Sequence, residues 1–360
     1  MPTGGDLPMV FRRFLFLSVL LCCWSTSASA HVKWFADYNL VCPPRSPTQI
    51  IFGEYFLLFC LAVAPIMFAT SYIDQYLVRE QEWPSRVADR LTDWTQAYFP
   101  MAMRVGVSAF FVSAALYGGF ILTPELKTES SFVLAMHVVI AALALHPRTA
   151  CLAGFGIATL YVYAVEQFGW YHLLDYPIFL GVGAYLMINS LFGEERALVA
   201  LNTMRWCTGV TLLWAGIEKF AFPEWSFGLL TEQPDLAFGF NAEFYMVSAG
   251  FVEFCCAYML ITGMLAARIA ALVLLFFFVS AIYYFGLIDA IGHSAIIIVL
   301  AILILSRNPM ASIFINHDLI KVSAINTVVF FVILLIFIGL YCGGHYLSYH
   351  PSEIPHECAL

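Results

Sequence analysis

Apolar runs of membrane-spanning length recur along almost the whole chain, and they constrain its fold more than any other feature. A helix needs about 20 mostly apolar residues to cross about 30 Å of hydrocarbon. Runs of this kind, separated by Pro, Gly and charged residues, predict an all-α polytopic membrane protein with about ten transmembrane helices. The predicted spans are 49–72, 101–122, 131–146, 149–167, 173–192, 204–221, 243–264, 267–286, 290–306 and 323–346.

The composition agrees with this fold class and excludes others. Hydrophobic residues make up 62% of the chain and charged residues only 11%, whereas soluble domains carry about 25% charged residues. The net charge is −8, and the sequence has no basic stretch that would neutralise phosphates. We therefore expect the lipid bilayer as a partner and exclude nucleic acid.

The N-terminus has the pattern of a secretory signal peptide. A basic pair at 12–13 precedes an apolar run at 14–24, and an A-x-A cleavage site ends at Ala30. The run of about 11 residues is too short to span the bilayer. We expect residues 1–30 to be cleaved, so that His31 becomes the first mature residue on the outer side. An uncleaved anchor helix is the alternative.

The distribution of Lys and Arg provides an independent check of the topology. Ten helices after the signal peptide place both mature termini on the outer side. Ten basic residues then lie on the inner side and four on the outer side, as the positive-inside rule requires. This predicts a multi-pass protein of the bacterial inner (plasma) membrane. The inner set is Arg79, Arg86, Arg90, Arg104, Arg148, Arg196, Arg205, Arg268, Arg307 and Lys321, and the outer set is Lys33, Arg45, Lys127 and Lys219.

The spans and loops divide the chain into seven segments. Between 74 and 99, apolar residues recur at three- and four-residue spacing, which predicts an amphipathic helix on the inner interface. The segments are a signal peptide (1–30), an outer N-terminal segment (31–48), the first transmembrane helix with the inner amphipathic segment (49–99), a four-helix membrane unit (100–192), a second four-helix unit (203–306), an inner loop with the last transmembrane helix (307–346) and an outer tail (347–360).

The two four-helix units have similar helix spacing, which suggests an internal repeat. Met103-Arg104 opens the first helix of one unit and Met204-Arg205 opens the first helix of the other. Four helices per unit place both repeats in the same orientation in the membrane.

Two cysteines lie on the predicted outer side, where disulfides form. A bridge between Cys42 and Cys358 would join the two termini, and Cys342 is the alternative partner.

The second four-helix unit carries the most specific pattern. It reads Arg205-x3-Gly209-x6-Gly216-Ile217-Glu218-Lys219-Phe220, then Gly250-x2-Glu253-x9-Gly263-x4-Arg268, then Gly292-His293. This order resembles the DoxX family of small four-helix membrane proteins over residues 203–306. The resemblance implies a role in membrane redox chemistry, with quinone-linked enzymes or other redox enzymes as partners. The chain departs from the family in its Glu218-Lys219 pair and in its additional first half, signal peptide and tenth helix.

Ionisable side chains inside apolar spans are candidate functional residues, because each costs about 2.5–3.5 kcal/mol at the centre of a membrane helix. Glu253 lies inside its span and needs a partner or a bound proton. We expect Glu253 and Lys219 to face one shared cavity. Together with Glu218 and His293 they form the candidate catalytic set, in which Glu253 and His293 exchange protons and Lys219 polarises a quinone carbonyl.

Further polar residues are candidates for binding. Arg205 and His137 are the candidate cofactor-binding residues, with topology or helix packing as the alternative explanation. At the mature N-terminus, His31 offers its amine and its ring nitrogen to one metal ion, which suits Cu(II). His345 and His350, also on the predicted outer side, complete the candidate metal-binding set.

Three functional hypotheses follow. The first is a subunit in quinone-linked membrane redox or proton transfer, which receives electrons from a partner because the sequence has no haem, flavin or iron–sulfur motif. The second is a copper-binding or copper-transporting membrane protein that uses His31. The third is a non-catalytic membrane assembly subunit whose buried polar residues fix helix packing.

Overall fold

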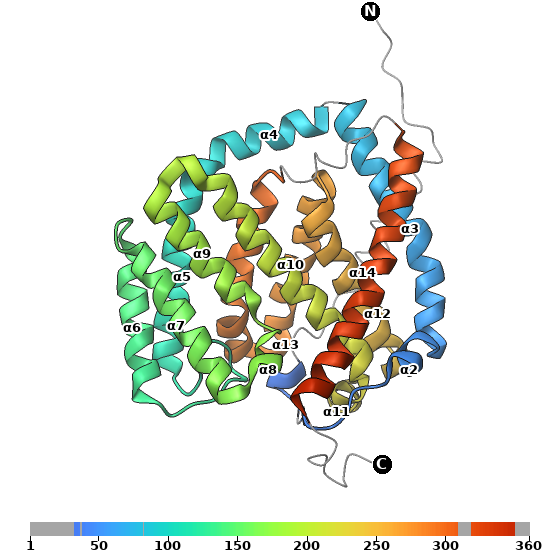
Figure 1. Ribbon diagram of the computed structural model, residues 1–360, viewed down its shortest axis with the longest axis horizontal. Helices are drawn as coiled ribbons and strands as arrows, with labels where there is room; N and C mark the ends of the chain where they lie inside the picture. The colour runs from blue at the N-terminus through green and yellow to red at the C-terminus, as the bar shows by residue number, and fades with distance from the viewer. Residues whose placement is uncertain (1–31, 37, 82, 309–317, 350–360) are drawn as a thin grey trace, which may run out of the picture.

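Most helices run side by side between two ends of the molecule, and one shorter helix lies across one of these ends. The computed structural model describes residues 32–36, 38–81, 83–308 and 318–349. Helix α4 (Trp83–Thr95) crosses one end, whereas α2 (Pro47–Ile51), α8 (Trp170–Leu173) and α11 (Phe227–Glu232) lie at the other (Figure 1). We call these the α4 end and the α8 end.

The long helices connect these two ends. They are α3 (Glu54–Arg79), α5 (Phe99–Tyr117), α6 (Ser131–Leu145), α7 (Ala150–Phe168), α9 (Pro177–Phe192), α10 (Ala197–Ala221), α12 (Ala242–Thr262), α13 (Leu265–Leu305) and α14 (Leu319–Ser348). Short 3-10 helices join them: η1 (Val32–Trp34), η2 (Gln96–Tyr98), η3 (Gly193–Arg196), η4 (Pro223–Ser226) and η5 (Pro234–Ala237).

The described helices confirm an all-α polytopic membrane protein. Seven helical stretches are long and apolar enough to cross a membrane, and one of them, Pro177–Ala221, contains both α9 and α10. With the shorter apolar α6 and the two limbs of α13 described below, each of the ten predicted spans lies largely on a described helical segment. The number of membrane crossings and their orientation stay predictions.

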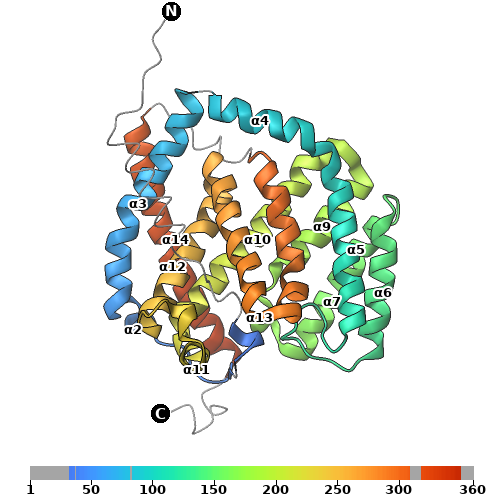
Figure 2. The same ribbon diagram turned by 180° about the vertical axis from the view of Figure 1, so that it is seen from behind.

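Helix α13 turns back on itself at Gly286. This residue has φ 72° and ψ −146°, a conformation that residues with a side chain rarely adopt. Arg268, near the start of α13, donates a hydrogen bond of 3.3 Å to the carbonyl of Ile304, near its end. A straight helix of 41 residues would be about 60 Å long. The contact therefore requires two limbs that lie side by side, as Figure 2 shows.

Two glycines of the DoxX-like pattern bring α10 and α12 close together. A Cβ added at Gly250 would lie 2.5 Å from the Phe220 ring and 2.9 Å from the carbonyl oxygen of Gly216. Only glycine leaves enough room for this approach. Lys219 and Glu253 each lie three residues beyond one of these glycines, so the same helix contact brings their side chains within reach of each other.

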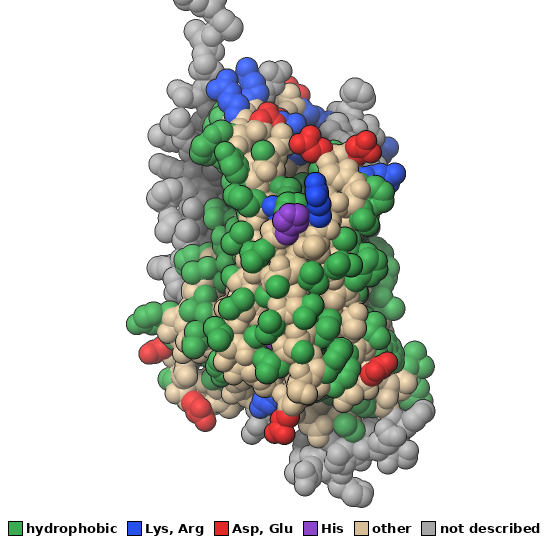
Figure 3. All heavy atoms as spheres, turned by 90° about the vertical axis from the view of Figure 1, so that its left-hand side faces the viewer, with side chains coloured by type: hydrophobic (Ala, Val, Ile, Leu, Met, Phe, Trp, Pro, Cys, Tyr) green, Lys and Arg blue, Asp and Glu red, His purple; other side chains and the backbone are tan. Residues whose placement is uncertain are grey.

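One face of the molecule carries an apolar band between two charged ends. Figure 3 shows hydrophobic side chains over the middle of one face, with charged side chains gathered near the ends. At one of these ends, α4 lies where the sequence predicts an amphipathic helix. Its Trp83, Val87 and Trp94 are exposed, while Thr92 is buried and donates to the carbonyl of Leu305 at 2.6 Å. The exposed aromatic residues suit a location among lipid headgroups.

The N-terminal segment and the end of α14 lie together at the α8 end. His345 of α14 is hydrogen-bonded through Nε2 to the carbonyl of Leu40 (2.8 Å), and the Arg45 amide donates to the carbonyl of Ala221 (2.9 Å). Cys42 is disulfide-bonded and Cys342 is a free thiol. Cys342 is therefore not the partner of Cys42.

Several sequence predictions fall outside the described residues or are not tested by the fold. The proposed signal peptide, His31, His350 and Cys358 lie outside the described part of the chain. The division into segments and the internal repeat also stay predictions, although four long helical segments lie in each four-helix unit when the two limbs of α13 are counted separately.

Candidate functional site

Five titratable side chains meet at the α8 end, and we call them the Lys33 cluster: Lys33, Glu125, His172, Asp175 and Glu218. They come from η1, from the loop between α5 and α6, from α8 and the loop after it, and from α10. The Lys33 side chain is only 2% exposed. Its Nζ lies 2.5 Å from Asp175 Oδ2 and 4.0 Å from Glu125 Oε1, and it also pairs with Glu218.

Glu125 is the most completely bonded carboxylate of this cluster. Its side chain is 1% exposed and contacts Lys33, while His172 Nε2 and the Tyr176 hydroxyl donate to its two oxygens. Burial alone would raise the pKa of Glu125, but the nearby Lys33 and the hydrogen bond from His172 hold that pKa well below its usual value. Glu125 is therefore the fixed negative charge of the cluster.

In the rest of the cluster, burial and the neighbouring charges act in opposite directions on the pKa of each group. Burial opposes the charged form of Lys33, but the carboxylates of Asp175, Glu218 and Glu125 outweigh it and raise the pKa of Lys33 well above its usual value. Burial raises the pKa of Asp175, with Lys33 acting in the opposite direction. One ammonium and one imidazole face three carboxylates, which is an arrangement that can bind and release a proton.

Trp34, the residue after Lys33, covers a second buried pair. Its ring centroid lies 4.5 Å from that of His293, and His293 Nδ1 lies 3.0 Å from Asp289 Oδ2. Both side chains of this pair are 1% exposed. A Cβ at Gly292 would lie 2.3 Å from the Trp34 ring. The Gly292-His293 sequence thus makes room for Trp34 and places the imidazole beneath it.

Lys219 and Glu253 form a third buried group, an ion pair between α10 and α12. Lys219 Nζ lies 2.5 Å from Glu253 Oε2 and 3.4 Å from the carbonyl oxygen of Ala215. The two side chains are 10% and 11% exposed. The structure therefore brings together two of the residues that the sequence singles out, and the carboxylate has the cationic partner that its burial requires.

Adjacent residues of α10 belong to two of these groups. Glu218 reaches the Lys33 cluster and also accepts a hydrogen bond of 3.3 Å from the Tyr341 hydroxyl, whereas Lys219 reaches Glu253. Two consecutive residues at the end of α10 therefore belong to different buried groups, Glu218 to the Lys33 cluster and Lys219 to the pair with Glu253.

The remaining described candidates lie apart and bond to the protein itself. Arg205 donates to Ser306 Oγ and to the carbonyl of Arg307, each at 2.9 Å. His137 is hydrogen-bonded to the carbonyl of Ile121 at 2.7 Å. With His345 bound to the N-terminal segment, the structure does not gather Arg205, His137 and His345 into one site.

Four members of the Lys33 cluster were not among the residues predicted from the sequence. Lys33, Glu125 and His172 lie in short segments next to the predicted spans, and Asp175 lies at the outer end of one of them, where the hydropathy pattern carries no information about contacts. The useful signal was their position, because all four lie on the same predicted side of the membrane.

The fold and the buried ion pairs define an integral membrane protein with charged groups held inside its helical bundle. Comparison with known families adds a more specific result. The DoxX family model matches residues 200–287, which cover α10, α12 and the first limb of α13. This match confirms the resemblance predicted for the second half of the chain. The matched residues include Glu218, Lys219 and Glu253. No curated protein and no solved structure matches the chain.

Proposed function

We propose that this DoxX-like membrane protein transfers protons as a subunit in quinone-linked membrane redox chemistry. One observation carries the proposal: Glu218 and Lys219, adjacent at the end of α10, join two buried groups of titratable side chains. Ionisable residues inside membrane helices commonly form proton relays, because burying them without a role is costly.

The Lys33 cluster provides the proton-holding end of this relay. Asp175 and Glu218 share the single ammonium of Lys33, and burial raises the pKa of Asp175. A proton that arrives at the cluster therefore has a buried carboxylate to occupy. The carboxylate that follows the Lys33 cluster in this relay is Glu253 of α12, which pairs with Lys219 of α10.

A quinone would supply two-electron, two-proton redox chemistry, but the described candidate residues do not form a ready site for its ring. The ammonium of Lys219 is already paired with Glu253, and His293 lies against Asp289. We therefore assign Lys219 to holding the Glu253 carboxylate rather than to polarising a carbonyl. In this proposal the quinone reacts at an associated redox enzyme.

The test measures quinone-dependent proton release in membrane vesicles that contain the full chain and its native redox partners. We expect Glu253→Gln and Glu218→Gln each to lower the rate at least tenfold, because each removes a carboxyl group that binds a proton. Glu166→Gln is the matched control, since Glu166 is exposed on α7. Unchanged rates in both buried variants, with the protein folded, would reject proton transfer and favour a role in assembly.

Metal binding is the second candidate function, and a specific observation favours it. Glu125, His172 and Asp175 each offer one ligand atom, and these atoms lie within 4.8 Å of one another. Two carboxylates and one imidazole are an acceptable donor set for a divalent metal. Lys33 provides the positive charge at this position, so a metal ion would have to replace its ammonium.

Copper stoichiometry of the purified, processed protein tests this second function. If copper binds through the mature N-terminus, His31→Gln and a variant that retains Ala30 before His31 should both lose it. If a metal binds at the Lys33 cluster, His172→Gln should lose it instead and Lys33→Met should gain affinity. Equal metal content in all four variants would remove the metal hypothesis.

A further inference from the structure

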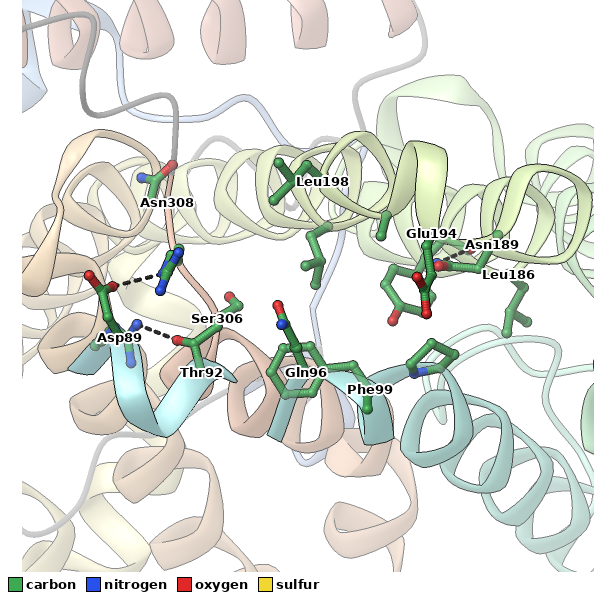
Figure 4. Close-up of a pocket in the computed structure, with 18 of the residues that line it drawn as sticks. Asp89, Thr92, Gln96, Phe99, Leu186, Asn189, Glu194, Leu198, Ser306 and Asn308 are labelled. Carbon is green, nitrogen blue, oxygen red and sulfur yellow. Dashed lines mark hydrogen bonds and ion pairs between the residues drawn. The ribbon is translucent and has the colours of Figure 1, made fainter. Parts of the chain in front are cut away.

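A large cavity lies at the α4 end, far from the buried ion pairs. Its volume is about 900 Å³, which is within the usual range for a site that binds a small molecule. Figure 4 shows Asp89, Thr92 and Gln96 on the α4 side of the cavity and Glu194 and Leu198 on the opposite side. Lys33, Lys219, Glu253 and His293 do not line it.

The lining of this cavity is basic. Among the described residues, it contains four arginines and two acidic residues, Asp89 and Glu194. Asp89 is already bound to Arg307, which lies 2.8 Å from it and 3.0 Å from Asp93. The cavity therefore has more positive charge than its own carboxylates neutralise. The arginines are Arg104, Arg148, Arg268 and Arg307.

Three of these arginines contact no carboxylate through any described hydrogen bond or ion pair, and two of the three, Arg104 and Arg268, are partly buried. Arg268 donates to Thr92 Oγ1 at 2.7 Å and to the carbonyl of Ile304 at 3.3 Å, both of which are neutral acceptors. Arg104 Nε is buried and has no hydrogen-bond partner among the described residues. A buried donor that stays unpaired is unfavourable, because it has lost its hydrogen bonds to water. An anion in the cavity would satisfy it.

The cavity also has an apolar side and lies next to the predicted membrane interface. Phe99, Leu186 and Leu198 line it together with the arginines. The adjacent α4 exposes Trp83 and Trp94, which are typical of residues at headgroup level. Basic pockets between membrane helices on the cytoplasmic side bind the headgroups of anionic lipids. The lining thus combines a cationic and an apolar surface.

We propose that this cavity binds a phosphate-bearing anion, with Arg104 and Arg268 as its cationic contacts. Planar guanidinium groups donate paired hydrogen bonds to phosphate oxygens, which makes Arg well suited to this role. An anionic phospholipid and a soluble phosphate compound offer the same recognised group. The proposal is independent of proton transfer at the α8 end.

The experiment measures thermal unfolding of the full chain in a neutral detergent and bound lipid by native mass spectrometry. The probes are phosphatidylglycerol, phosphatidylcholine and inorganic phosphate. We expect phosphatidylglycerol to raise the unfolding midpoint at concentrations at which phosphatidylcholine has no effect. Arg104→Gln and Arg268→Gln should each weaken its apparent affinity at least tenfold. Arg90→Gln should not, because Arg90 is exposed on α4 and does not line the cavity.

The inorganic phosphate arm distinguishes the source of the anion. Stabilisation by phosphatidylglycerol alone supports a lipid ligand, and equal stabilisation by phosphate supports a soluble one. Ala197→Trp is a second variant, in case Arg104→Gln fails to fold. It fills part of the cavity without changing the charge of the lining, and it should abolish the stabilisation by phosphatidylglycerol. Equal responses to the two lipids, with none to phosphate, would overturn the proposal, as would wild-type affinity in Arg104→Gln.

Discussion

At the α8 end the buried charges face one another, whereas at the α4 end they face a cavity. Lys33 touches three carboxylates in a space that is nearly closed to solvent. Arg104 and Arg268, in contrast, line a space of about 900 Å³ and bond only to neutral groups or to none that is described. Paired buried charges can exchange a proton without any ligand, while unpaired ones favour a ligand from outside. The two ends are therefore suited to different tasks.

Removal of the central cation at the α8 end, Lys33, should have the largest effect on stability. Lys33→Met leaves three buried carboxylates without their ammonium, and breaking a buried ion pair in this way costs about 3–5 kcal/mol. Chemical denaturation of the purified protein measures the loss. Lys127→Met is the control, since Lys127 is exposed in the loop that also carries Glu125. Equal stability of the two variants would show that Lys33 is not the structural cation we infer.

The Lys219–Glu253 pair should give the next largest effect. Glu253→Gln leaves the Lys219 ammonium without its carboxylate. We expect a loss at the lower end of the range of about 3–5 kcal/mol for a broken buried pair, because these side chains are slightly more exposed than Lys33. The double variant Lys219→Met with Glu253→Gln should recover part of this loss. A double variant as unstable as the sum of both single variants would mean that the two residues act independently.

A smaller effect is expected from acid. The pKa of Glu125 is lowered in the folded protein, so its stabilising contribution is complete above the ordinary carboxyl pKa of about 4.3 and decreases as the pH falls through its folded value. Unfolding midpoints between about pH 3 and pH 6 should therefore fall on the acid side. Glu125→Gln should flatten this dependence. An unchanged acid response in that variant would assign it to other carboxyl groups.

The smallest effect should come from an ion pair at the same end that solvent reaches. Arg45 pairs with Glu224 and with Glu243 at 2.5 Å, but its side chain is 26% exposed and theirs are 52% and 37% exposed. Exposed pairs contribute about 0–1 kcal/mol, so Arg45→Gln should lower the stability by less than about 1 kcal/mol and the effect should shrink in high salt. A loss of stability as large as that of Lys33→Met would show that burial does not determine how much the Arg45 pairs and the Lys33 cluster each contribute.

The sequence predicts the helices far better than the contacts between them. Hydropathy reports directly on contact with lipid, so the ranges around α10, α12 and α14 follow from apolar runs alone. Hydropathy also predicts two separate spans, 267–286 and 290–306. This prediction agrees with the structure, in which the chain reverses at Gly286 between the two limbs of α13. The association of Glu253 with Lys219 was predictable too, because a buried carboxylate needs a partner.

The Lys33 cluster was not predictable in this way. Lys33 and Asp175 are 142 positions apart, and His172 and Glu125 are 47 apart. These residues lie in loops and short helices that have no periodic pattern, so only the tertiary fold determines which of them meet. From sequence alone, Lys33 counts as one more outer charge in the topology.

Lys33 also ties the N-terminal segment to the assembly of the helical bundle. Lys33 and Trp34 precede every spanning helix that the structure describes. Lys33 nevertheless contacts carboxylates that lie far along the chain, and Trp34 covers the His293–Asp289 pair of α13. The helices must therefore assemble around an acidic pocket before or while this segment docks. Docking of η1 then places an ammonium among the buried carboxylates and covers the His293–Asp289 pair with Trp34. A chain with a displaced N-terminus should be inserted in the membrane and still be immature.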